Sequence, residues 1–182
     1  MDIVIPAISK KTSRWTGWFD IEWTINGEKF VDRAYNQLYD QGEQDLLEVF
    51  FRAATAPTTF NIGLLKGAYS IVETHTMTDV AAQELTNAAD GGYSARQVIT
   101  RDNTGWPTSA LNGGDWQLTS AQVTWTATGA WTDTASYMFL MSGGTTTPAN
   151  TTGRILAVAA LSPTRQLQAV NDTLKVSYSV KL

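Results

Sequence analysis

The segment WTGWFDIEWTINGEKFV, residues 15–31, decides the fold class of this chain. Apolar and polar side chains alternate along its first half, which is the pattern of a β-strand with one buried face. The alternating apolar residues are Phe19, Ile21, Trp23 and Ile25. Asn26-Gly27 follows, the pair favoured in a two-residue type I′ turn, and Phe30-Val31 falls on the returning strand. The segment therefore predicts a β-hairpin.

Composition extends this prediction to the whole chain. Its 182 residues are enough for one ordinary domain to bury its own core. Only 16% of the residues are charged, and the seven tryptophans and many threonines suit half-buried, pleated surfaces better than helices. We therefore expect one folded, mainly β domain.

Charge and cysteine content argue against several classes of function. The net charge is -4 and the basic residues are scattered, which disfavours nucleic-acid binding. The absence of cysteine excludes disulfides, thiolate nucleophiles and cysteine-bound zinc. No apolar run approaches the roughly 20 residues of a membrane span. The start, MDIVIPAISKK, lacks the basic region of a signal peptide, so we expect synthesis in the cytoplasm of a host cell.

The remaining sequence predicts further strands and two short helices. Residues 101–115 are rich in turn-forming pairs and are expected to form a loop. The long strand at 115–129 changes phase between Leu118 and Val123, which predicts a β-bulge near 119–121. The other strands are expected at 58–65, 94–100, 136–144, 153–162 and 171–182. The strands at 136–144 and 153–162 are almost continuously apolar, so both of their faces should be covered.

The first helix is expected at about 43–54 and the second at about 78–86. Apolar residues fall at helical spacing in the first, and acidic residues stand early in it, where the helix dipole favours them. Thr78 is the expected N-cap of the second helix. Together these elements predict a β-sandwich of jelly-roll-like type, with an N-terminal arm at 1–18 and a single β-sandwich domain at 19–182. The apolar residues of the first helix are Leu46, Leu47, Phe50 and Ala54.

The segment DGGYSARQVITR, residues 90–101, resembles a phosphate-binding loop but has its elements in the wrong order. Such a loop needs a strand, then glycines, then a helix, whereas these glycines follow a helix and open a strand. We expect Arg96 to pair with a carboxylate and to pack its stem on an aromatic ring. His75, the only histidine, has no neighbouring nucleophile signature and is expected to be structural or exposed. No catalytic residue, cofactor or metal site is predicted.

Five blocks of the sequence, in this order, resemble a family of small β-rich virion structural proteins of tailed bacteriophages, whose members are head or tail components. They are GEQDLLEVFFRAATAPTTFNIGLL (42–65), GGYSARQVI (91–99), AQVTWTATGAW (121–131), GRILAVAALS (153–162) and NDTLKVSYSVKL (171–182). The resemblance covers roughly three-quarters of the chain, from about residue 42 to the end, and residues 1–41 have no counterpart in it. It implies a virion component without fixing its position in the particle.

The leading hypothesis is a capsid decoration (cement) protein that binds the head exterior. Its expected partners are the major capsid protein and copies of itself, as a trimer or dimer, without nucleic acid or membrane. The alternatives are a tail-associated receptor-binding or fibre module, whose aromatic loops would stack on sugars, and a glycan-degrading enzyme with paired carboxylates. Trp23 and Trp125 are expected in the core. The candidate interface residues are Ile3, Val4, Ile5, Trp15, Trp18, Trp106, Trp116 and Trp131.

Overall fold

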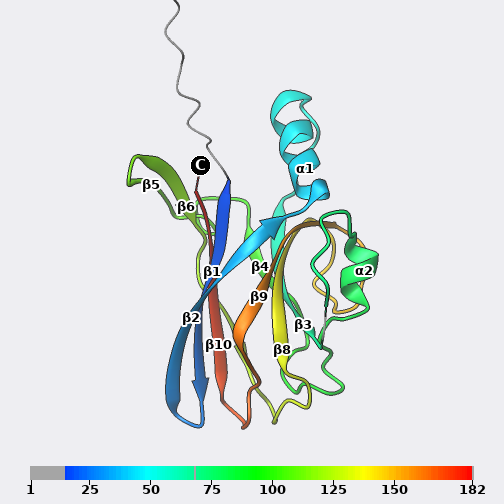
Figure 1. Ribbon diagram of the computed structural model, residues 1–182, viewed down its shortest axis with the longest axis vertical. Helices are drawn as coiled ribbons and strands as arrows, with labels where there is room; N and C mark the ends of the chain where they lie inside the picture. Colours follow the sequence, from blue (N-terminus) through cyan, green and yellow to red (C-terminus); the bar gives the residue numbers. More distant parts are fainter. Residues whose placement is uncertain (1–14, 68, 182) are drawn as a thin grey trace, which may run out of the picture.

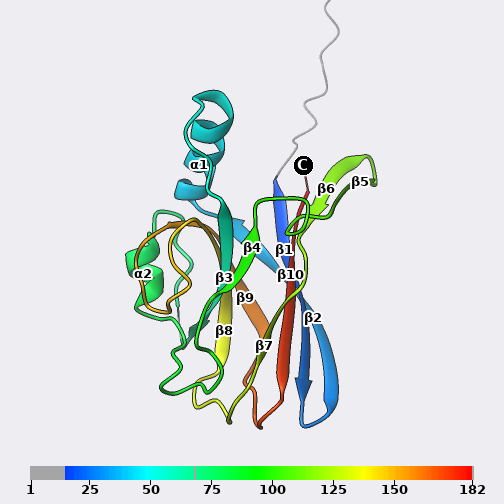
Figure 2. The same ribbon diagram turned by 180° about the vertical axis from the view of Figure 1, so that it is seen from behind.

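The computed structural model describes residues 15–67 and 69–181. Within these ranges, ten antiparallel strands form a sheet that curls into a half-barrel, with two short helices outside it (Figures 1 and 2). The prediction of a mainly β fold with two short helices is confirmed. The strand order is β4-β3-β8-β9-β2-β1-β10-β6-β5, and β7 also pairs with β10.

The elements have the following bounds. The strands are β1 (Thr16–Ile25), β2 (Glu28–Leu38), β3 (Thr59–Lys66), β4 (Gln97–Thr100), β5 (Thr108–Asn112), β6 (Asp115–Thr119), β7 (Val123–Thr126), β8 (Ala135–Ser142), β9 (Arg154–Arg165) and β10 (Thr173–Lys181). The helices are α1 (Asp40–Phe51) and α2 (Met77–Ala81).

The predicted hairpin forms β1 and β2. Asn26 and Gly27 have φ values of 51° and 80°, as a type I′ turn requires. Phe19, Ile21 and Trp23 of β1 are at most 2% exposed, so the alternating residues do face the core. The first part of β2 pairs with β1 and its end pairs with β9. Because β2 joins the two halves of the curled sheet, their inner faces can pack on one shared core.

The two faces of β8 confirm the prediction that this strand is covered on both sides. Met138 and Leu140 belong to the inner core, which β1, β3, β7 and β10 also line. Phe139 and Met141 belong to a second cluster on the outer face, where Val80 of α2 contributes. The sheet therefore has one large core inside the half-barrel and a smaller one beneath α2 (Figure 1).

Both helices end earlier than predicted. α1 ends at Phe51, and Ala53 has a φ of 52°, so Ala54 lies outside the helix. α2 begins after Thr76 rather than Thr78, because Thr76 and Asp79 form a capping box. It stops at Ala81 because the following residues bond to β3, including Leu85, whose N–H donates to the Leu64 carbonyl at 3.0 Å.

The expectation of a loop at 101–115 is wrong, because this segment contains β5, which pairs with β6 as a hairpin. Every residue of β5 is exposed, so no alternating apolar pattern marks the strand in the sequence. The predicted bulge is confirmed by the register with β10. Thr119 pairs with Ser179 and Val123 pairs with Val176. The four steps from Thr119 to Val123 therefore lie opposite only three steps of β10, which is the extra residue of a bulge.

Asp172 stabilises the end of the half-barrel that holds the β1–β2 turn. Its carboxylate accepts the backbone N–H groups of Asn26 at 2.8 Å, Gln168 at 2.8 Å and Ala169 at 2.9 Å. Burial alone would raise the pKa of Asp172, but the three donors outweigh it and the pKa is lowered. Since the folded pKa is below the unfolded one, this stabilisation is complete above the unfolded value of about 3.9 and is lost as the pH falls through the folded value.

We expect Asp172→Asn to lower the free energy of unfolding by about 1–3 kcal/mol at pH 7, because an amide cannot accept from all three donors. The loss should shrink at pH 3, where the carboxylate of the unmodified protein begins to be protonated. Urea unfolding of both proteins at the two pH values measures this difference. An equal loss at pH 7 and pH 3 would contradict the assignment.

Candidate functional site

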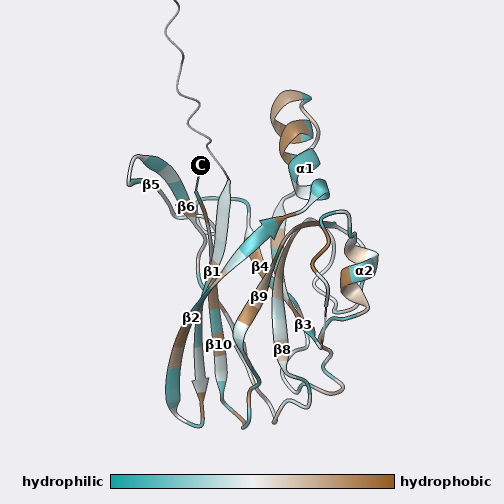
Figure 3. Ribbon diagram, viewed as in Figure 1, coloured by the Kyte–Doolittle hydropathy of each residue, from teal (hydrophilic) through white to brown (hydrophobic). Residues whose placement is uncertain are grey.

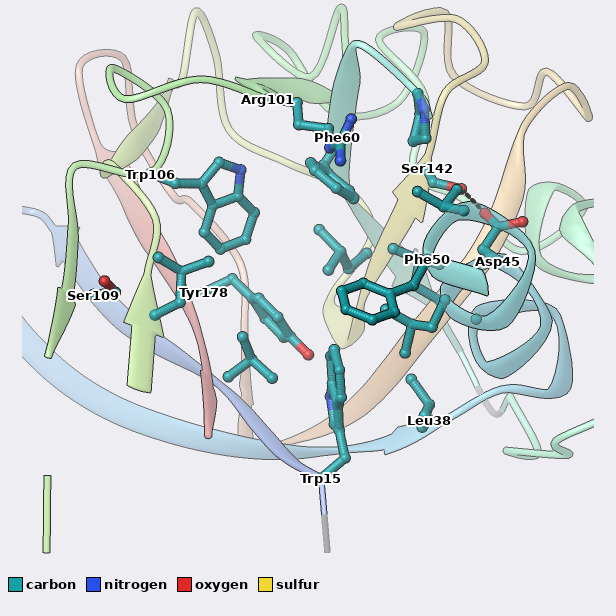
Figure 4. Close-up of a pocket in the computed structure, with 18 of the residues that line it drawn as sticks. Trp15, Leu38, Asp45, Phe50, Phe60, Arg101, Trp106, Ser109, Ser142 and Tyr178 are labelled. Atoms are coloured by element: carbon teal, nitrogen blue, oxygen red, sulfur yellow. Dashed lines mark hydrogen bonds between the residues drawn. The ribbon is translucent and has the colours of Figure 1, made fainter. Parts of the chain in front are cut away.

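One end of the half-barrel carries an open groove of about 600 Å³ between α1 and the β5–β6 hairpin (Figure 4). We call it the end groove. Its lining is mainly apolar, with polar groups at the rim. The apolar lining consists of Trp15, Leu38, Leu46, Val49, Phe50, Pro57, Phe60, Trp106, Pro107, Leu118, Leu140, Leu156, Tyr178 and Val180, and the rim includes Asp45, Arg101, Asp102, Asn103, Ser109 and Ser142.

The α1 wall of the end groove is held at its base and projects beyond the body of the protein (Figures 1 and 2). Gly42 rests on β9, where an added Cβ would lie 2.8 Å from the Leu156 carbonyl oxygen, so a glycine is needed for this approach. Gln41 accepts the N–H of Ile155 at 3.0 Å, and Asp45 forms an ion pair with Arg154 at 2.6 Å and a hydrogen bond with Ser142. The helix beyond these contacts extends into solvent.

The opposite wall is the loop between β4 and β5, which Asp102 shapes. Its carboxylate accepts the backbone N–H groups of Gly105 and Thr104, each at 2.8 Å, and the Thr100 hydroxyl. The Gly105 bond, the Thr100 bond and the Thr104 bond lower the pKa of Asp102, so the carboxylate stays ionised. The loop brings the Trp106 ring edge-to-face against Phe60, at a centroid distance of 5.4 Å.

Tyr178 of β10 forms part of the groove floor. Its hydroxyl donates to the Asn36 side chain at 3.2 Å, and its ring meets Trp106 at a right angle, 6.4 Å between centroids. Burial raises the pKa of Tyr178, so the hydroxyl stays neutral. Trp15, at the start of the described chain, stands beside this hydroxyl (Figure 4). The floor is thus a fixed aromatic surface without an ionised group.

Exposed apolar side chains surround the end groove. On α1, Leu47, Phe50 and Phe51 are 59%, 82% and 75% exposed, and the outer part of this helix is correspondingly hydrophobic in Figure 3. On the β5–β6 hairpin, Leu111 and Trp116 are 63% and 61% exposed. We call the end groove and these side chains the end face. Exposing so much apolar surface on one side of a molecule is characteristic of a site that contacts another protein.

The structure places the predicted interface residues in different environments. Trp15 and Trp106 both line the end groove, and Trp116 lies on the end face. Trp18 is buried, with the Arg33 guanidinium 5.1 Å from its ring centroid, and Trp131 is 2% exposed in the core, where its indole N–H donates to Gly91. Ile3, Val4 and Ile5 lie outside the described residues.

Sequence reasoning missed the outer part of α1 as a surface feature. The helical spacing of Leu46, Leu47 and Phe50 served only to predict the helix, and none of these residues was among the candidate interface residues. The adjacent pair Phe50-Phe51 was the available signal, because neighbouring residues of a helix point about 100° apart and so widen its apolar surface. A helix with apolar side chains on several sides needs a partner beyond its own domain.

Arg96 and His75 both lie away from the end groove. Arg96 is confirmed to pair with a carboxylate, that of Glu84, and its guanidinium lies 5.6 Å from the Phe139 ring centroid. The Nδ1 atom of His75 lies 2.8 Å from the Tyr69 hydroxyl oxygen, next to α2 and outside the lining of the end groove. Neither residue contributes to the end face.

Across residues 15–67 and 69–181, no group of three or more His, Cys, Asp or Glu side chains is placed to hold a metal ion. The helices of the same ranges are too short and too polar to cross a membrane. The sequence matches no protein-family model, and no curated protein shows significant similarity to it.

Proposed function

We propose that this chain is a structural protein of a tailed-phage virion, which binds the outside of the head through the end face and joins neighbouring capsid subunits. The observation that carries the proposal is the projecting helix α1, which is fixed at its base and exposes apolar side chains on more than one side. Large aromatic side chains of this kind dominate the binding energy of protein interfaces. The resemblance to phage virion proteins supports the choice of particle.

The geometry of α1 supports contact with a neighbouring protein. Phe50 lines the end groove, and its ring packs edge-to-face on the ring of Phe51 at a centroid distance of 5.1 Å, while both side chains are mostly exposed. The two rings form one exposed aromatic patch on the projecting helix, which a capsid subunit can cover. Each contact of about 1,200–2,000 Å² would be modest, and several contacts per oligomer would make retention long-lived.

The alternative of a sugar-binding tail module has less support from the aromatic residues that it would use. Trp131 is in the core, and the Trp106 ring packs edge-to-face on Phe60 and Tyr178. Only Trp116 of that trio offers a widely exposed ring. The glycan-degrading alternative needs two available carboxylates, and the groove's Asp45 and Asp102 are both engaged in the contacts described above.

Replacing Leu47 and Phe51 together by Ser should reduce binding to purified phage heads by ten-fold or more. Both side chains are exposed, so folding should be unaffected while apolar contact with the capsid is lost. The matched control is Val31→Ser with Tyr35→Ser on β2, where the side chains are 71% and 64% exposed but lie outside the end face. Quantitative mass spectrometry of heads after sedimentation measures the bound copies.

The same measurement on whole particles separates the proposed role from its alternative. A decoration protein is present in hundreds of copies on the head, whereas a receptor-binding module is present in a handful at the tail. Unchanged binding of the Leu47 and Phe51 variant, or a handful of copies restricted to the tail, would contradict the proposal.

A further inference from the structure

The described chain begins at the rim of the end groove. Trp15 lines the groove, and β1 leads from there toward the opposite end of the half-barrel (Figures 1 and 4). Residues 1–14, which we call the N-terminal segment, are therefore joined to the described chain at the groove, through Trp15. Fully extended, 14 residues span about 45 Å at roughly 3.3 Å per residue, which is enough to reach the groove of an adjacent copy.

The N-terminal segment has the apolar character that the groove requires. Ile3, Val4, Ile5 and Pro6 form an uncharged run. The first three residues are β-branched, and Ile5 also precedes proline; both properties favour an extended backbone. Proline also has no backbone N–H that would lose its hydrogen bond to water on burial. If such a segment bound in the groove, the apolar surface of the segment and that of the groove lining would both be removed from water.

The charges of the two partners are complementary. The N-terminal segment has three basic residues, Lys10, Lys11 and Arg14, against one acidic residue, Asp2. The helix α1 carries Asp40, Glu43, Asp45 and Glu48, and no basic residue stands in its last turn.

Two of these acidic residues are available to a partner. Asp40 and Glu43 are exposed, and neither forms an ion pair with another described residue. Glu43 precedes Leu46 by three positions and Phe50 by seven, so the three side chains share one side of the helix. A basic residue that follows the apolar run would pass beside Glu43.

We propose that the end groove holds the N-terminal segment of a second copy of this chain. Nine residues separate Ile5 from Trp15, and they span about 30 Å when extended. To enter its own groove, whose wall Trp15 forms, the segment would have to double back over this length. Between two copies, the same nine residues form a direct bridge, and an exchange of N-terminal segments between the two copies closes a symmetric oligomer.

Site-directed cross-linking tests this proposal on the full chain, which contains no cysteine of its own. One preparation carries Val4→Cys and a second, tagged preparation carries Phe50→Cys in the groove wall. The control partner is Val31→Cys, because Val31 is 71% exposed on β2 and outside the groove lining. After addition of a thiol oxidant, we expect the Val4→Cys and Phe50→Cys chains to form a mixed disulfide at least ten-fold faster than the Val4→Cys and Val31→Cys chains.

Two results would overturn the proposal. Equal cross-linking rates with Phe50→Cys and Val31→Cys would show that the groove does not hold the segment. A chain carrying both Val4→Cys and Phe50→Cys that closes an internal disulfide at high dilution, faster than it links to other chains, would assign the groove to its own N-terminal segment. The assay contains no phage heads, so its result is independent of the proposed decoration role.

Discussion

Replacing Arg96 by Met will lower the free energy of unfolding by about 3–5 kcal/mol. Arg96 and Glu84 have no exposed side-chain surface, and their carboxylate–guanidinium contacts measure 2.7 Å and 2.9 Å. Without Arg96, the Glu84 carboxylate would be left buried without its counter-charge. Arg96 also donates to the carbonyl oxygens of Thr145 at 3.1 Å and Asn150 at 2.7 Å, so the loop that follows β8 would lose both of these side-chain hydrogen bonds.

Urea unfolding of Arg96→Met measures this loss, and Arg52→Met is the matched control. Arg52 also pairs with a glutamate, Glu48, at 2.8 Å, but it is 74% exposed, and an exposed pair of this kind contributes less than about 1 kcal/mol. Arg96→Lys keeps the charge but not the forked geometry, so its stability should lie between those of the parent and Arg96→Met. A loss below about 1 kcal/mol for Arg96→Met would show that Glu84 does not depend on Arg96.

Replacing Trp125 by Ala will lower the free energy of unfolding by about 3–5 kcal/mol, because it leaves a large cavity in the inner core. Trp125 is 1% exposed on β7, and its ring stacks on that of Tyr93 at a centroid distance of 5.9 Å. Its indole N–H donates to the Ala95 carbonyl at 3.0 Å, and that acceptor would also be left without its partner. Few neighbours can move into the space, since the pairing of β7 with β10 holds the backbone around it.

Trp116→Ala provides the comparison for Trp125→Ala. Trp116 is on β6, which pairs with β10 as β7 does, but its side chain is 61% exposed. We expect its loss to change stability by less than about 0.5 kcal/mol. Thermal unfolding of the two variants measures the contrast. Similar effects would mean that Trp125 is not the core residue that its burial indicates.

The turn and strand chemistry of this chain could be predicted because it is local. The Asn26-Gly27 turn, the alternation along β1 and the bulge between β6 and β7 depend on residues a few positions apart. The exposed strand β5 could not be found in this way. It has no buried face, so only its pairing with β6 distinguishes it from a loop.

The candidate site was predicted in part. Trp106 and Trp116 were chosen because aromatic residues in turns often contact partners, and both lie at the end face. Trp131 was chosen for the same reason, yet it is buried with its indole N–H bonded to Gly91. Position near a turn does not reveal on which side of the sheet a side chain lies, because that depends on what packs against it.

The sequence by itself determined that this is a mainly β chain with a type I′ hairpin, and that Arg96 needs a carboxylate partner. The hairpin follows from the backbone preferences of residues next to each other in the chain. The need for a carboxylate follows from the free-energy cost of burying an unpaired charge. Only the tertiary structure decided that α1 turns its apolar residues outward and that Trp15 and Trp106 line one groove. Both depend on how the sheet curls, which brings together residues about 90 positions apart and leaves no core surface for the outer part of α1 to cover.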